Sequence, residues 1–288
     1  MSPTLLGALL MTASMAAFTL NDTMLKLTAG TIPLFQLIFV RSVITCCLMF
    51  VTRGRIGTMH FRIARRDWFV IAARATAEVC ISYFFLKALF HMPLANLTAI
   101  MQVVPLMVTL ASALVLREAV GWRRFAAIFI GFLGVLLIVK PGAEGFTIWS
   151  VYALIAVLGV TVRDLITRKL SPLVPSMTVA FSTAASVMVA FGLASLSEAW
   201  VPIGPLTWLL IIGSAIAIMA GYFCSIWVMR VGEVSFTAPF RYTGLVWALL
   251  MGWFVFAEWP GWMTLIGAAI VVATGVFTFY RERKLSAV

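Results

Sequence analysis

Apolar residues run along this chain in blocks of about 20, and short polar segments separate the blocks. A block of that length, folded as an α-helix, matches the thickness of the hydrocarbon layer of a membrane. Turn-forming sequences such as HMPL (91–94) and SPLVP (171–175) lie between blocks. The pattern predicts ten spanning helices, at roughly residues 5–27, 33–52, 68–89, 94–116, 122–140, 147–167, 176–196, 206–229, 234–257 and 262–280.

Composition supports the membrane assignment. Of the 288 residues, 63% are hydrophobic and only 11% are charged, with a mean hydropathy of +1.08. A soluble domain is about half apolar and about a quarter charged. We therefore expect an all-α membrane protein whose first block is retained as a spanning helix.

Basic residues give the chain a net charge of +11, and their distribution predicts its orientation. One set of alternate loops holds only Lys26 and Lys140, with Lys87 close to the same surface. We expect the other side, which carries both termini, to be cytoplasmic in an inner (plasma) membrane. No polar basic face typical of nucleic-acid binding is formed. The basic residues assigned to the cytoplasmic side are Arg53, Arg55, Arg62, Arg65, Arg66, Arg117, Arg123, Arg124, Arg163, Arg168, Lys169, Arg230, Arg281, Arg283 and Lys284.

One short phrase occurs twice, as EAVGW at 118–122 and as EWPGW at 258–262. Five predicted crossings separate the two copies, so they lie on opposite sides of the bilayer. Other residues recur at nearly the same offset: Asp22, Lys26 and Pro33 correspond to Asp164, Arg168 and Pro175, and Thr98–Ala99 corresponds to Thr237–Ala238. We predict two five-helix repeats of inverted topology, 1–142 and 143–288, within one membrane unit. Such repeats favour a carrier that works by alternating access.

The segment LREAVGWRRFAAIFIGFLGVLLIVKPG (116–142) resembles the fourth-to-fifth helix passage of the drug/metabolite transporter superfamily, in its ten-helix EamA-type branch. FAEWPGWMTLIGAAIVVATGV (256–276) is similar to that family's closing helix pair. FTLNDTMLKL and FQLIFVRS resemble the opening pair of members assigned to riboflavin or S-adenosylmethionine uptake. The resemblance implies a central cavity lined by both halves, with the fifth and tenth helices at the periphery. It does not select a substrate.

Four ionisable residues stand out because they fall deep inside predicted spans: Arg41, Arg74, Glu78 and Arg241. Ionisable groups within the membrane face the bundle interior and mark functional sites. Arg74 and Glu78 are four residues apart on one helical face, so they either form an ion pair that stabilises their helix or contact cargo. Arg41 and Arg241 then remain as buried cations that suit an anionic or zwitterionic cargo, or that bind backbone carbonyls.

Two prolines predict helix breaks within the membrane. Pro105 follows Gln102 in the fourth span, and Pro239 precedes Arg241 and Tyr242 in the ninth. A proline frees a carbonyl one turn earlier, which membrane proteins tolerate where it lines a cavity. The alternative is a simple kink. Two further aromatic residues lie deep enough either to stack on a planar cargo or to pack in the core, Tyr83 and Trp247.

Gating is predicted at two i,i+4 pairs on opposite faces, Asp22–Lys26 and Asp164–Arg168. The alternative is a pair of interfacial salt bridges. Glu78, near the midplane, is the candidate for a coupled proton.

The function predicted is secondary transport of a small polar, anionic or zwitterionic metabolite. Export of amino acids or drugs is one alternative, and a receptor or assembly subunit without transport is another. Neither catalytic nor metal-binding motifs occur, so we expect no enzyme, cofactor or metal, and a monomer rather than a dimer.

Overall fold

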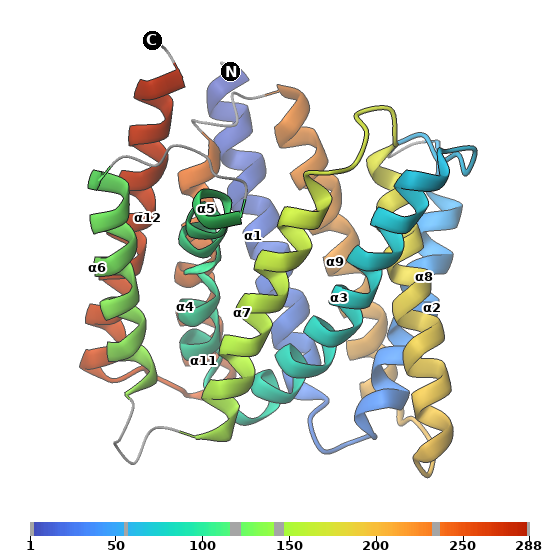
Figure 1. Ribbon diagram of the computed structural model, residues 1–288. Helices are drawn as coiled ribbons and strands as arrows, with labels where there is room; N and C mark the ends of the chain where they lie inside the picture. The colour runs from blue at the N-terminus through green and yellow to red at the C-terminus, as the bar shows by residue number, and fades with distance from the viewer. Residues whose placement is uncertain (1–2, 55–56, 116–121, 141–146, 232–236, 287–288) are drawn as a thin grey trace.

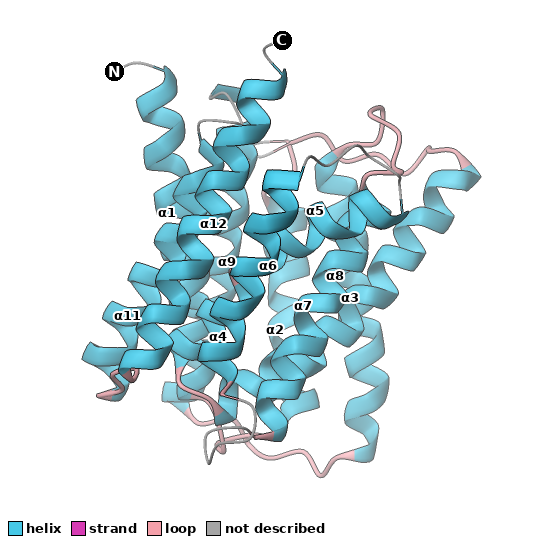
Figure 2. Cartoon of the chain, turned by 60° about the vertical axis from the view of Figure 1, so that its left-hand side comes forward, coloured by secondary structure: helices cyan, strands magenta, loops and turns pink. Residues whose placement is uncertain are grey.

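The computed structural model describes residues 3–54, 57–115, 122–140, 147–231 and 237–286, and within these ranges the chain is helical without strands. Figure 2 shows the helices joined by short loops. The α-helices are α1 (Pro3–Leu27), α2 (Leu34–Val51), α3 (Arg65–His91), α4 (Leu94–Met101), α5 (Val104–Val115), α6 (Trp122–Val139), α7 (Ile148–Thr167), α8 (Ser176–Ala194), α9 (Pro205–Val231), α11 (Thr243–Phe256) and α12 (Trp262–Ser286), and η1 (Ser195–Ser197) and η2 (Ala238–Tyr242) are 3-10 helices.

These elements are consistent with the ten predicted spans. The fourth predicted span is divided into α4 and α5, and the ninth is made by η2 followed by α11. Seven spans in the described residues are long and apolar enough to cross a membrane, and two shorter apolar stretches lie at Phe125–Val139 in α6 and at Trp262–Thr278 in α12. The chain is a multi-pass membrane protein.

Both termini lie at the same end of the helix bundle in both views (Figures 1 and 2). We call this end the terminal face and the opposite end the distal face. The link between α7 and α8 lies at the terminal face, and the links between α1 and α2 and between α11 and α12 lie at the distal face (Figure 1). Even numbers of crossings therefore return the chain to the face where it began.

The helix packing has the symmetry of an inverted repeat. The first helix of one half packs on the third helix of the other, which produces the two extensive contacts α1–α9 and α3–α7. The second helices, α2 and α8, pack on each other, and so do the fifth helices, α6 and α12. A pseudo-two-fold axis in the membrane plane relates such contacts.

The same symmetry holds at single residues. Gln36, three residues after Pro33, accepts a hydrogen bond from the Val201 N–H (3.1 Å) and donates one to the Val201 carbonyl (2.8 Å). Thr178, three residues after Pro175, has the same double contact with the backbone of His60, at 3.2 and 2.9 Å. Each side chain is buried and fixes the segment that leads into the third helix of the other half.

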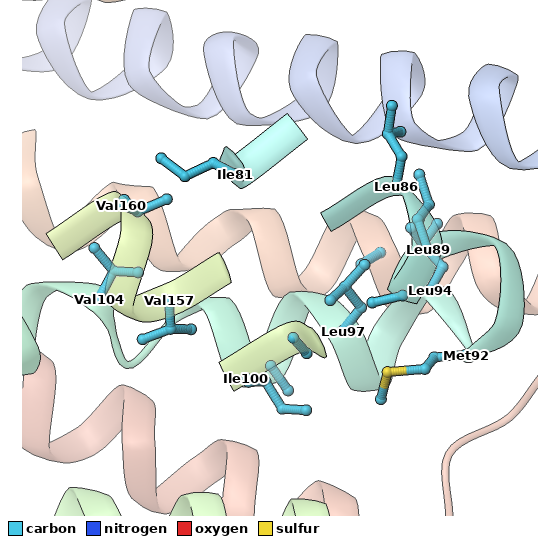
Figure 3. Packing of buried hydrophobic residues seen from close by; sticks show 14 of the residues in the cluster. Ile81, Leu86, Leu89, Met92, Leu94, Leu97, Ile100, Val104, Val157 and Val160 are labelled. Atoms are coloured by element: carbon cyan, nitrogen blue, oxygen red, sulfur yellow. The ribbon is translucent and has the colours of Figure 1, made fainter. Parts of the chain in front are cut away.

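Apolar side chains fill the middle of the bundle between α3, α4 and α7 (Figure 3). Leu89, Leu94, Leu97 and Ile100 have no exposed surface. Lipid solvates apolar side chains as well as a protein interior does, so burying them from lipid gives no hydrophobic driving force. Dense van der Waals packing therefore holds this core together.

The predicted repeat boundary at 142/143 lies outside the described residues, as do Arg55, Arg117 and Glu118. The two-repeat division at that position remains a prediction.

Candidate functional site

A cavity of about 320 Å³ lies between the two halves, toward the terminal face. Two halves of the chain form its walls, because α2 and α3 belong to the first repeat and α7, α8 and α9 to the second. The lining combines one guanidinium, two hydroxyl-bearing aliphatic residues, a set of apolar side chains and two aromatic rings. These residues are Met49, Arg74, Thr167, Leu170, Val174, Ser176, Met177, Val179, Ala180, Met219, Tyr222 and Phe223.

Arg74 is the cation of this cavity. Its Nε donates to the Thr167 hydroxyl (3.0 Å) and its Nη1 donates to the Thr183 hydroxyl. Both hydroxyls donate in turn to backbone carbonyls one turn earlier, at 2.7 and 2.8 Å, so their lone pairs face the guanidinium. The described residues place no carboxylate within ion-pair distance of Arg74. Neutral groups therefore orient the guanidinium, while Glu78 and Asp164 act on its charge from beyond ion-pair distance.

Glu78 binds a different arginine from the one predicted. Its Oε2 accepts from Arg163 Nη1 at 3.1 Å, and Arg163 also donates to Asp164 Oδ1 at 3.0 and 2.8 Å. The alternative of an ion pair between Arg74 and Glu78 is therefore not found among the described residues, and Arg163 lies within α7 and not in a loop. Because α3 and α7 pack on each other, an arginine on α7 reaches Glu78 more directly than the arginine on the same helix.

Asp22 and Arg41 form a second charged site. Asp22 accepts a hydrogen bond from the Asn21 amide (2.9 Å), and Arg41 interacts electrostatically with Asp22, Glu78 and Tyr222. The Nε of Arg41 is buried without a hydrogen-bond partner among the described residues. Arg41 is thus a membrane-embedded cation, as expected, but it has an acidic neighbour in α1. Together the two sites hold three arginines and three carboxylates.

Lys26 joins the two halves at the distal face. Its Nζ lies 2.8 and 2.9 Å from the two carboxylate oxygens of Glu258 and 2.7 Å from the carbonyl oxygen of Met92, and 4.7 Å from the centre of the Phe256 ring. The lysine side chain is only 9% exposed. The predicted Asp22–Lys26 pair is wrong because its lysine reaches across to the other repeat.

Backbone geometry positions Glu258. Ala257 ends α11 in the left-handed conformation, with φ of 53°, and the Glu258 N–H bonds to the Gly252 carbonyl at 2.9 Å. The glutamate Oε2 also accepts from the Leu94 N–H (3.2 Å) at the start of α4. Glu258 therefore holds the first turn of α4 as well as the end of α1.

Arg168 lies at the terminal face. Its side chain is exposed, and its Nη1 donates to the Ser112 hydroxyl in α5 at 2.8 Å. Asp164 binds Arg163 instead, so the predicted Asp164–Arg168 pair is not among the ion pairs of the described residues. In both predicted gate pairs the basic residue forms a hydrogen bond outside its own helix, and a gating role for these residues stays a prediction.

The two broken spans meet near the centre. The α4 helix ends at Met101 and α5 begins at Val104, just before Pro105, while Pro239 lies inside the 3-10 segment η2. The Gln102 amide donates to the carbonyl oxygen of Arg241 at 3.3 Å, which joins corresponding positions of the two halves. The Arg241 side chain is exposed, so the expectation of a buried cation there is wrong.

The predicted aromatic residues lie away from the cavity lining. Tyr83 packs in a group of rings with Phe35, Phe84 and Tyr152. Tyr242 is buried, and its hydroxyl occupies the space where a side chain on Gly275 would begin. The Trp247 indole N–H is buried with no hydrogen-bond partner among the described residues.

Sequence reasoning missed the cavity residues Tyr222 and Thr167 and the Arg74 partner Thr183. A hydroxyl or a ring inside an apolar run gives no signal until the helix that faces it is known. The sequence did contain an indication that Arg163 belongs to the site. Arg163 directly precedes Asp164, just as the polar residue Asn21 directly precedes Asp22 at the corresponding position of the other repeat.

The family model described as the EamA-like transporter family matches this chain twice, at residues 5–140 and 147–280. The chain belongs to the EamA-like transporter family. The two matches fall on the two halves that the packing symmetry relates.

Several members of the family with assigned roles are similar to this EamA-like chain. It is 28% identical to an S-adenosylmethionine uptake transporter of Rickettsia felis over 194 residues, which are 67% of this chain and 65% of that protein. It is 31% identical to a riboflavin transporter of Vibrio cholerae over 68% of this chain and 66% of that protein. The matches thus span just under two thirds of these relatives. A pseudopaline exporter, CntI of Pseudomonas aeruginosa, is 25% identical over 92% of this chain and 93% of that protein.

One solved crystal structure has the same fold. It superposes with a TM-score of 0.68 and covers 97% of this EamA-like chain and 98% of its own, at 17% identity.

Proposed function

We propose that this protein is a secondary carrier that moves a small metabolite bearing a carboxylate across the inner (plasma) membrane by alternating access. The observation that carries the proposal is the cavity between the inverted halves, with the Arg74 guanidinium in its wall and no carboxylate of the described residues paired to it. A cation inside a membrane protein needs a counter-charge, and arginine presents a planar fork that fits a carboxylate.

The other cavity groups define the rest of the cargo. Tyr222 and Phe223 offer ring faces, and Met49, Met177 and Met219 offer polarisable thioethers. Arg163 and Arg41 have acidic neighbours, so the surroundings are nearly neutral overall. This combination favours an amino-acid-type zwitterion with a planar or sulfur-bearing body. S-Adenosylmethionine, named for some relatives, has a carboxylate of this kind, whereas riboflavin has none.

We further propose that the terminal face, which carries most of the basic residues, is cytoplasmic. The cavity then lies toward the cytoplasm, and the Lys26–Glu258 pair closes the path to the outside. In the sequence register of the repeat, Lys26 corresponds to Arg168 and Glu258 to Glu118. Exchange of conformations between the halves would use this second pair to close the cytoplasmic side in the outward-open state.

Counterflow in proteoliposomes tests the function. Vesicles preloaded with unlabelled S-adenosylmethionine are expected to accumulate labelled S-adenosylmethionine transiently, because a carrier exchanges cargo and a receptor does not. Arg74→Gln is expected to reduce the apparent affinity about tenfold to a hundredfold, since it removes a charge-assisted carboxylate contact. Arg74→Lys keeps the positive charge but loses the planar guanidinium. Its affinity for S-adenosylmethionine should therefore lie between those of the wild type and Arg74→Gln.

Two controls sharpen this experiment. Arg66→Gln removes an exposed arginine from the first turn of the same helix and should leave counterflow unchanged. Riboflavin serves as a carboxylate-free comparison. If Arg74→Gln weakens riboflavin and S-adenosylmethionine equally, the substitution has damaged the cavity and the carboxylate assignment is wrong.

Glu78 remains our candidate for a coupled proton. It lies within α3 beside the cavity arginine, and its bond to Arg163 would have to open for it to bind a proton. Glu78→Gln is expected to abolish the dependence of uptake on a pH gradient while counterflow persists. Asp22→Asn is the matched variant at the second charged site, on α1 of the same half. If the dependence of uptake on the pH gradient is unchanged in Glu78→Gln but lost in Asp22→Asn, the residue that binds the coupled proton is Asp22 and not Glu78.

Export remains the second candidate, because a relative matched over 92% of this chain and 93% of its own length is an exporter. The direction of net flux under an imposed pH gradient, measured in vesicles of known orientation, distinguishes export from uptake.

A further inference from the structure

The outer edge of the bundle carries a second hollow, separate from the central cavity. The α6 and α12 helices form this edge (Figure 1) and approach closely near the distal face, where a Cβ added to Gly134 would lie 2.8 Å from the carbonyl oxygen of Gly267. Glycine allows helix backbones in a membrane to approach this closely. Toward the terminal face the same two helices border a groove of about 570 Å³.

Small and apolar side chains line this groove. Ala126, Ala127 and Ala273 leave space between the helices, and Ile130, Thr274 and Phe277 complete the lining. Ile130 and Phe277 are 47% and 43% exposed. The outward side chains around the groove, Phe125, Phe129 and Leu133, are also exposed and apolar. The groove therefore faces the hydrocarbon region, where an acyl chain is the available filler.

The end of the groove nearest the terminal face is basic. Arg123 lines it, with its guanidinium 5.5 Å from the ring centre of Trp122, which is 74% exposed. An exposed tryptophan is typical of the headgroup region. Basic pockets between helices on the cytoplasmic side bind anionic lipid headgroups.

We propose that this groove is a binding site for a phospholipid with an anionic headgroup. One acyl chain occupies the apolar channel over the alanines, and the phosphate lies at Arg123. This lipid fills the space where α6 and α12 separate, and these two helices join the halves at their periphery. The site would therefore stabilise the contact between the repeats without touching the cargo cavity.

Purified full-length protein, stripped of lipid and reconstituted in phosphatidylcholine nanodiscs, tests the proposal. Phosphatidylglycerol is titrated in, and the melting temperature and the lipids retained in native mass spectrometry are measured. Phosphatidylglycerol should raise the melting temperature and be retained in preference to phosphatidylcholine. Arg123→Gln should reduce that preference about fivefold. Ala273→Phe should fill the groove and remove retention of both lipids.

Arg66→Gln is the matched control, since it removes an exposed arginine of the terminal face outside the groove and should keep the full preference. The proposal is overturned if the wild type retains both lipids equally, or if Arg123→Gln keeps the preference. Efficient disulfide crosslinking between two copies through Ala273→Cys would also overturn it, because the groove would then be an interface between protein chains.

Discussion

Replacing Lys26 by methionine is expected to open the distal face and to abolish concentrative transport. The lysine side chain is 9% exposed and its partner Glu258 is 31% exposed, so the pair lies between a buried and a surface ion pair. Its loss should cost about 2 kcal/mol in the distally closed state, intermediate between values for exposed and buried pairs. This corresponds to about a thirtyfold shift toward distally open conformations.

The shift toward distally open conformations can be measured by labelling a cysteine next to the Lys26–Glu258 pair. Met92→Cys places a thiol at a position that is 7% exposed, in a background without the four natural cysteines. A membrane-impermeant thiol reagent added from the distal side should react much faster when Lys26→Met is also present. Lys87→Met, a change at a lysine of the same face that forms no ion pair in the described residues, should leave the rate unchanged.

Charge exchange gives a second measurement. Lys26→Glu with Glu258→Lys restores opposite charges, but a lysine at 258 cannot accept the hydrogen bond from the Leu94 N–H that Glu258 accepts at 3.2 Å. We therefore expect partial recovery of transport compared with either single variant. Equal labelling of Met92→Cys with and without Lys26→Met would exclude a closing role for this pair.

The sequence was sufficient for the architecture because spanning helices have a simple physical signature. Apolar length predicted ten spans, with which the helices of the described residues are consistent, and Pro105 and Pro239 lie at the interrupted ones. The recurrence of Glu118 and Glu258 with an odd number of crossings between them indicated inverted repeats. Those conclusions need no knowledge of which helices are neighbours.

Partners of charged residues could not be predicted in the same way. The i,i+4 rule proposed Asp22 for Lys26 and Arg74 for Glu78, because only local neighbours are visible in a sequence. The observed partner of Lys26 is 232 residues away, and that of Glu78 is 85 residues away. In a low-dielectric interior a tertiary contact with good geometry outcompetes a local pair, so helix packing decides the pairing.

Arg163→Met is expected to cause the largest loss of stability of any single substitution in the cavity region. Arg163 on α7 binds Glu78 on α3 and the adjacent Asp164, and the arginine and Glu78 are 22% and 20% exposed. Methionine fills similar space but leaves two carboxylates close together without a cation. The pairs are partly exposed, so each lies between a surface and a buried ion pair, and removing the cation shared by two carboxylates should cost about 3 kcal/mol, largely because charges remain unpaired. We expect a large drop in thermal stability and no measurable counterflow.

A neutral version of the triad separates charge from packing. Arg163→Met combined with Glu78→Gln and Asp164→Asn removes every charge together, and neutral replacement of a buried ion network is often tolerated. This triple variant should recover most of the lost stability without regaining transport, because the charged groups beside the cavity are gone. Lys169→Met, a change at an exposed lysine just after the end of the same helix, should shift stability only slightly. A single Arg163→Met variant as stable as the wild type would show that the triad does not hold α3 to α7.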